Sequence, residues 1–152
     1  MAISVVIETR VGRPVDAVFA HIADLDRWPD WLIASGIIKI ARAGSDPVVA
    51  GEHLTVEQRA AGRAGTFSAT VTALQAPTRL ALTGKDADGV SIDIDAELAP
   101  VDALTTNLRW SIKIGLPFRY RIFEKMASPQ VQRAAALDIE ALKRRMESVA
   151  TD

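Results

Sequence analysis

The sequence predicts an α+β fold in which a curved antiparallel sheet, about six to seven strands, wraps around a long C-terminal helix. Three observations predict it: a strand-like opening segment, a middle region of alternating segments separated by turn residues, and a closing amphipathic helix. A chain of 152 residues fits one domain over residues 1–152 and is long enough to bury a core without disulfides.

The first elements are a strand and two short helices. Residues 3–11 are rich in β-branched side chains that alternate, which is typical of a strand. Pro14 is expected at the first position of a helix whose apolar face holds Val15, Val18, Phe19 and Ile22. Asp24 is then placed to cap a second short helix that carries Trp28 and Trp31.

The middle of the chain is a meander of hairpins whose turns predict a register. A turn at Ala61-Gly62 pairs Ala60 with Arg63, and a turn before Thr78 pairs that residue with Gln75. The resulting pairs are Val56–Phe67, Leu54–Ala69, Val71–Leu82, Ala73–Leu80, Leu82–Ile92, Leu98–Leu104, Ile94–Leu108 and Ile92–Trp110.

These registers place one apolar set on a single face of the sheet, and a slip of one residue would turn it outward. The set comprises Leu54, Val56, Phe67, Ala69, Val71, Leu80, Leu82, Ile92, Ile94, Leu98, Leu108, Trp110, Ile112 and Ile114. The opposite face is polar, so we expect one face of the sheet to be exposed to solvent.

The last helix is predicted to begin at Ser128-Pro129, with serine as the N-cap, and to run to about residue 148. Its apolar stripe consists of Val131, Ala135, Ile139, Leu142, Met146 and Val149.

Three segments resemble the START-like (SRPBCC) superfamily, and within it the polyketide cyclase/dehydrase and lipid-transport group. They are the opening strand that runs into residues 13–19, the W-P-x-W segment from Asp24 to Trp31, and the closing residues 138–143. The resemblance covers essentially the whole chain and implies a helix-grip fold with a cavity between the sheet and the long helix. It implies no single reaction, because the superfamily includes carriers, cyclases and protein-partner modules.

Composition excludes several classes of protein. The chain has no cysteine, which excludes disulfides, thiol catalysis and thiolate metal sites. The net charge of −1 argues against a general nucleic-acid binder. No segment has the length of a membrane span, and the first ten residues lack the pattern of a signal peptide, so we expect a cytoplasmic protein. The composition permits a homodimer but does not require one.

Aromatic residues are the first candidates for ligand contact. Trp28, Trp31, Phe67 and Trp110 are expected to line the cavity together with Leu82 and Ile94, and an indole N–H would give a ligand one polar anchor. The alternative is that each tryptophan packs in the hydrophobic core and contacts no ligand. Gln58 and Thr106 share the inward face, where they would either bond a ligand or meet water at the sheet ends.

The junction before the last helix is rich in aromatic and basic groups. Phe118, Tyr120 and Phe123 would form a lid at the cavity mouth, where an arginine would meet an acidic end of the ligand. The alternative is a short helix packed on the sheet edge with its arginines in water.

Asp138 falls near the middle of the apolar stripe of the last helix. A carboxylate there would face the cavity with a raised pKa, suited to acid–base chemistry, and Tyr120 is a second candidate proton carrier. The alternative is a slightly rotated helix that leaves Asp138 beside water.

No metal or cofactor is expected. Asp93, Asp95 and Glu97 share one outer face, where ion pairing, with Arg109 opposite Asp93, explains them better than a metal. His21 and His53 have no ligand-like spacing, and no nucleophile elbow, P-loop or dinucleotide motif is present.

These observations lead to three functional hypotheses. The first is binding, with transport as its extension, of a small hydrophobic molecule such as a lipid, polyketide or aromatic metabolite. The second is a cyclase or dehydratase acting on a polyketide-like substrate. The third is a protein-interaction module, which a closed cavity and a broad exposed apolar patch would favour.

Overall fold

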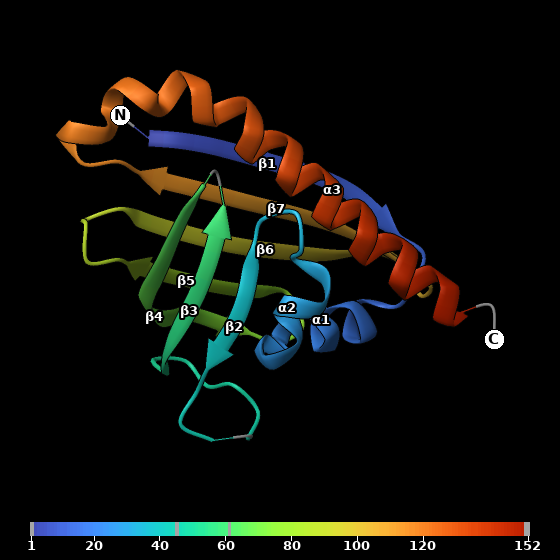
Figure 1. The fold of residues 1–152 in the computed structure, drawn as a ribbon. Coiled ribbons are helices and arrows are strands. Elements are labelled where there is room, and N and C mark those ends of the chain that lie inside the picture. Colours follow the sequence, from blue (N-terminus) through green and yellow to red (C-terminus); the bar gives the residue numbers. More distant parts are fainter. Residues whose placement is uncertain (1, 45, 61, 151–152) are drawn as a thin grey trace.

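A computed structural model describes residues 2–44, 46–60 and 62–150 (Figure 1). Seven strands form one antiparallel sheet in the order β1-β7-β6-β5-β4-β3-β2. The elements are β1 (Ala2–Val11), α1 (Val15–Ala23), η1 (Leu25–Arg27), α2 (Trp28–Trp31), β2 (Ile37–Ala41), β3 (His53–Ala60), β4 (Arg63–Gln75), β5 (Arg79–Lys85), β6 (Ser91–Asp102), β7 (Thr105–Gly115), η2 (Phe118–Phe123) and α3 (Glu124–Ala150).

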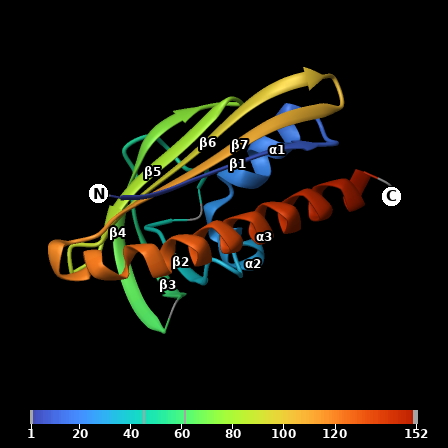
Figure 2. The ribbon, with the colours of Figure 1, turned by 90° about the horizontal axis from the view of Figure 1, so that it is seen from above.

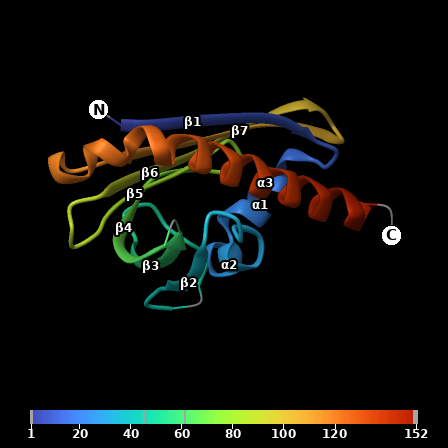
Figure 3. The ribbon, with the colours of Figure 1, turned by 45° about the horizontal axis from the view of Figure 1, so that its top comes forward.

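The helices all lie on one side of the curved sheet. Figure 2 shows α3 as a layer of its own below the sheet. Figure 3 shows α1 and α2 beside the C-terminal half of α3. Apolar side chains from α1, α2, the second half of α3 and the inner face of the sheet form one core. The predicted helix-grip architecture is confirmed. No helix in the described ranges is long and apolar enough to cross a membrane.

The predicted inner face of the sheet is also confirmed. Of its fourteen predicted members, all are buried except Ile92 and Ile114, which are half-buried. The pairs Ala60–Arg63, Val56–Phe67, Leu54–Ala69 and Val71–Leu82 form as predicted. The turn residue Ala61 lies outside the described residues, and Gly62 has a φ of 73°, which glycine adopts without strain.

In the other predicted pairs the partner residue is wrong. The true partner lies two or four residues away along the strand, or one residue away at a bulge. In the β5–β6 hairpin Leu82 faces Ile94. In the β6–β7 hairpin Leu98 faces Leu108, because both strands continue to a tight turn at Ala103-Leu104. The carboxylate of Asp102 accepts a 2.8 Å hydrogen bond from the Leu104 N–H and thereby stabilises that turn. The remaining corrected pairs are Ile94–Ile112, Ile92–Ile114, Arg109–Glu97 and, beyond a bulge in β4, Leu80–Leu74 and Ala73–Ala81.

The helix starts differ in detail from the prediction. Pro14 is the N-cap of α1. Asp24 makes no side-chain capping bond, and its carboxylate instead lies 3.3 Å from the Arg27 guanidinium. The long helix begins at Glu124, four residues before the predicted serine cap. Because η2 leads directly into α3, the first turn is already formed before Pro129, which lies inside the helix.

Candidate functional site

A cavity of about 350 Å³ lies between the concave face of the sheet and the first half of α3. Its floor comes from β6 and β7, its roof from α3, and its side wall from the loop after α2 and the ends of β2 and β3. The lining residues are Leu32, Ala34, Ser35, Ile37, Gln58, Arg59, Ala60, Ile92, Ile94, Trp110, Ile112, Ile114, Ala127, Gln130, Val131 and Ala134.

Small side chains on the roof explain why this space is open. Ala127, Val131 and Ala134 follow one another at helical spacings of four and three, so they point to the same side of α3. Short side chains at these positions do not fill the space above the isoleucines of the floor, in contrast to the close-packed core nearby. The sequence of α3 therefore creates the cavity.

Polar groups are concentrated toward the opening of the cavity. Arg59 and Gln130 are exposed, and Gln58 lies deeper, where its Nε2 donates a 2.8 Å hydrogen bond to the Ser35 carbonyl. This bond ties β3 to the loop that follows α2. The cavity is therefore apolar on its floor and roof and polar at one side.

A second, much smaller space of about 20 Å³ continues the cavity toward the core. Trp28, Phe67 and Leu82 line it, and Gln58 and Ile94 border both spaces. A space of this size holds about one water molecule. Three of the predicted ligand-binding residues thus surround this inner end of the cavity, while Gln58, Ile94 and Trp110 line its main part.

The three tryptophans form one buried cluster with edge-on ring contacts. Ring centroids lie 6.2 Å apart for Trp28 and Trp31, 5.8 Å for Trp28 and Trp110, and 5.5 Å for Trp31 and Trp110. The Trp28 indole donates a 2.8 Å bond to the Ile22 carbonyl. The indole N–H groups of Trp31 and Trp110 are buried and have no hydrogen-bond partner within the described part of the chain. Of these two residues only Trp110 lines the cavity, where an unpaired donor favours a ligand that supplies an acceptor.

The sequence and the structure both match known proteins. A family model described as "Polyketide cyclase / dehydrase and lipid transport" matches residues 2–147. The chain belongs to this family. A search of curated proteins finds no significant match.

Solved structures share the fold of this family member at low sequence identity. A START superfamily protein from Mycobacterium smegmatis is 15% identical, with a TM-score of 0.73 over 96% of this chain and 98% of that one. The Zhui aromatase/cyclase from a Streptomyces species is 16% identical, with a TM-score of 0.77 over 97% and 94%. A protein from Thermus thermophilus is 13% identical, with a TM-score of 0.75 over 96% and 98%.

Asp138 of this family member is buried, but it does not line the cavity. Its two carboxylate oxygens each accept a 2.8 Å hydrogen bond, one from the Ala34 N–H and one from the Ser35 N–H. Burial raises the pKa of Asp138 above its ordinary value, although these hydrogen bonds act in the opposite direction. The carboxylate holds the loop that forms the cavity wall against α3.

Four other predicted site residues also lie off the cavity lining. Thr106 is fully buried and donates a 2.8 Å bond from Oγ1 to the Arg13 carbonyl. Tyr120 is half-buried, with the Arg119 guanidinium 5.0 Å from its ring centroid. Phe118 is strongly exposed. Trp31 lines only a shallow outer recess that it shares with Asp138.

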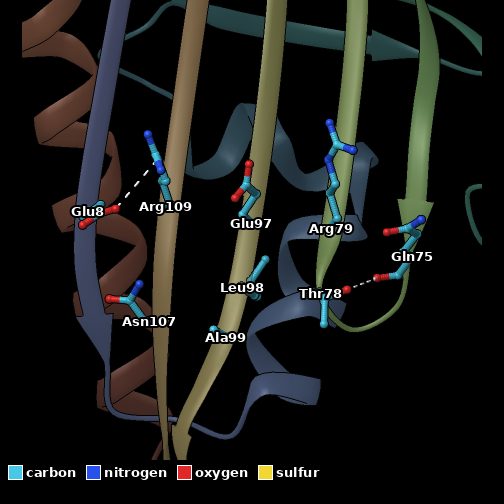
Figure 4. Close-up of a pocket in the computed structure, with 9 residues that line it drawn as sticks. All are labelled: Glu8, Gln75, Thr78, Arg79, Glu97, Leu98, Ala99, Asn107 and Arg109. Carbon is cyan, nitrogen blue, oxygen red and sulfur yellow. Dashed lines mark hydrogen bonds and ion pairs between the residues drawn. The ribbon is translucent and has the colours of Figure 1, made fainter.

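The outer face of the sheet carries a wider and more polar recess of about 570 Å³ (Figure 4). Glu8, Arg109, Glu97 and Arg79 face one another in register across four strands, with 3.8 Å between Glu8 and Arg109. Arg79 also pairs with Asp95 at 2.8 Å. These charges compensate one another in water, and no cluster able to hold a metal occurs among the described residues. The inner cavity is therefore the better candidate for a ligand site.

Sequence reasoning missed much of the cavity wall. The loop residues Leu32, Ala34 and Ser35 carry no sequence signal for a cavity, because only the tertiary arrangement brings them beside α3. Ala127 and Ala134 do carry one, since small residues at helical spacing mark a helix face without large side chains.

Proposed function

We propose that this protein binds one small, mainly apolar molecule in the cavity beneath the first half of α3. The observation that carries the proposal is the cavity itself, with isoleucine and tryptophan on its floor and alanine and valine on its roof. Burying an apolar ligand against these side chains is favourable in proportion to the area removed from water.

The size of the cavity narrows the class of ligand. A volume of about 350 Å³ is near the small end of the range of roughly 300–1,000 Å³ that is usual for ligand pockets. It suits a compact aromatic, isoprenoid or polyketide-like molecule better than a lipid with two long chains. Gln58, Arg59 and Gln130 favour a ligand with one polar end directed toward the opening.

Binding is proposed ahead of catalysis because neither predicted proton carrier lines the cavity. Asp138 is engaged with two backbone N–H groups, and Tyr120 lies under Arg119. Transport of the ligand and a cytoplasmic location remain predictions, as does a cyclase or dehydratase reaction.

The test is native mass spectrometry of the purified protein, followed by solvent extraction and mass analysis of any released molecule. A panel of small aromatic and isoprenoid compounds is then added to the protein. We expect one hydrophobic molecule per chain. An unliganded mass that persists across the whole panel would count against the proposal.

A pair of variants assigns the bound molecule to the cavity. Ala134→Trp places a large side chain on the roof, whereas Ala136→Trp places the same side chain on an exposed position of the same helix. We expect the first variant to lose the adduct and the second to keep it. Equal occupancy in both variants would place the ligand elsewhere.

A further inference from the structure

Four large apolar side chains are exposed within nine residues at the start of α3. Phe118 is 85% exposed, Ile122 79%, Met126 69% and Phe123 50%. We name these four residues the η2 tip. Scattered exposed apolar residues are ordinary, but four in one short segment mark an interaction surface.

The η2 tip is held in place beside the opening of the cavity. Leu116 and Tyr120 pack against the core on either side of Phe118, so the segment is anchored while the tip side chains face water. Met126 is followed directly by Ala127, the first roof residue of the cavity. Figure 1 shows η2 and the first turns of α3 projecting at one corner of the molecule, away from the C-terminus.

Basic side chains surround the η2 tip. Residues 118–137 contain Arg119, Arg121, Lys125 and Arg133 but only one acidic residue, Glu124, whereas the whole chain has a net charge of −1. Arg121, Lys125 and Arg133 form no ion pair with any described residue. Arg119 lies 3.8 Å from the Asp88 carboxylate, so Arg121, Lys125 and Arg133 are the cations of this corner that remain available to an external partner.

We propose that the η2 tip docks on an anionic lipid surface. The four apolar side chains enter the interfacial layer, and Arg121 and Lys125 meet lipid phosphates. Exposed aromatic and aliphatic side chains mixed with cations are the chemistry that such a surface binds. A second copy of the chain fits less well, because tip-to-tip contact would bring two positively charged corners together.

The docking surface extends the proposed function without depending on it. Because Ala127 and Val131 lie directly after the tip, docking brings the opening of the cavity close to the lipid surface. A ligand that partitions into lipid would then exchange without crossing bulk water. Docking itself is measurable with an empty cavity.

The test is cosedimentation with vesicles made of phosphatidylcholine alone, or of equal parts phosphatidylcholine and phosphatidylglycerol. We expect binding to the anionic vesicles that weakens as salt is raised, because salt screens the cations. Phe118→Ser/Ile122→Ser should weaken this binding by about tenfold or more, because apolar area no longer leaves water. Arg121→Gln/Lys125→Gln should weaken it by about thirtyfold, at roughly 1 kcal/mol for each cation near a charged membrane.

Matched controls separate docking from general surface effects. Leu104→Ser removes an apolar side chain at the β6–β7 turn that is 69% exposed, the same fraction as Met126, and Lys113→Gln removes an exposed cation from β7. Both should bind vesicles as the unaltered protein does. Circular dichroism of each variant checks that the fold is intact.

Two results would overturn the proposal. One is equal sedimentation of the tip variants and their controls. The other is a dimer, seen by analytical ultracentrifugation, that dissociates on Ile122→Ser without any vesicle binding, which would assign the tip to a second copy. The variant Ala134→Trp distinguishes this proposal from the previous one, because it should lose the cavity ligand and still bind anionic vesicles.

Discussion

The two halves of α3 have the same helical backbone but contact the rest of the molecule differently. In the second half, Ala135, Asp138, Ile139, Leu142 and Met146 are all buried against the sheet and the short helices. In residues 124–134 no side chain is buried. The first half is the roof of the cavity and the second half is part of the core.

This difference shows how one helix serves both stability and binding. Tertiary packing of an apolar face supplies most of the stability of a helix in a protein. The packed half therefore fixes the position of α3, and the first half, which has only partly buried apolar side chains, extends from it over the cavity. The free energy needed to hold the cavity open is consequently supplied by residues that do not line it.

The largest expected difference in stability is between two variants that each truncate one apolar residue, one in each half of α3. Leu142→Ala should lower the free energy of unfolding by about 2–5 kcal/mol, because it leaves a void in a close-packed core. Val131→Ala should lower it by less than about 1 kcal/mol, because Val131 is half-buried beside an existing cavity. Urea unfolding of both variants measures the difference, and equal losses would mean that the two halves are packed alike.

Asp138 connects the two regions, so its substitution should come next in size. Asp138→Asn leaves one of the two backbone N–H groups of Ala34 and Ser35 without a good acceptor, at a cost of about 1–3 kcal/mol. Urea unfolding measures that loss. Because the same loop forms a cavity wall, ligand occupancy by native mass spectrometry should fall as well. Unchanged stability would mean that the loop does not depend on this carboxylate.

The pH dependence of Asp138 has a definite sign. Burial raises its pKa above 3.8 in the folded protein, so the folded state binds this proton more tightly than the unfolded chain does. Its contribution to the free energy of unfolding is therefore least favourable at neutral pH. It rises as the pH falls through the folded pKa and levels off below 3.8. The stability difference between the unaltered protein and Asp138→Asn should grow on acidification, and a difference that shrinks would contradict the raised pKa.

The sequence allowed the faces of the sheet to be predicted much better than its registers. Alternation with a period of two assigns each residue to a face, and a register error of two or four residues leaves that assignment intact. Leu98 was therefore placed on the correct face although its partner is Leu108 and not Leu104. The turn at Ala103-Leu104 lacks glycine and proline, so it carried no strong signal in the sequence.

The candidate site was less predictable because it depends on contacts between distant segments. The period of the last helix placed Asp138 on the apolar face, but its partners are backbone N–H groups more than one hundred residues away. Backbone donors carry no side-chain signal. The same limit applies to the cavity wall near Leu32, whereas Ile94 and Trp110 were found because strand alternation alone directs them inward.

Substitution of two buried tryptophans should change the free energy of unfolding by unequal amounts, and this difference is of intermediate size. Trp28 and Trp110 are equally buried, but only Trp28 has a partner for its indole N–H among the described residues. Trp28→Phe should therefore cost about 1 kcal/mol more than Trp110→Phe in urea unfolding, since it also leaves the Ile22 carbonyl unpaired. In ligand binding the order should reverse, because Trp110 lines the main part of the cavity, whereas Trp28 borders only the small inner space. A larger stability loss for Trp110→Phe would mean that its N–H is satisfied within the protein.

The smallest expected effect tests how the packed end of α3 is held at its edge. The Glu147 carboxylate accepts a 2.8 Å hydrogen bond from the Gly12 N–H and lies 3.3 Å from the Lys143 ammonium. Glu147→Gln keeps one acceptor but removes the charge, so urea unfolding should show a loss of about 1 kcal/mol or less. Glu140→Gln changes an exposed carboxylate on the same helix and should cost nothing measurable. Because Glu147 belongs to the packed half, neither substitution should alter ligand occupancy. A loss of ligand on Glu147→Gln alone would mean that the two halves of α3 move together. The cavity would then depend on contacts made at the far end of the helix.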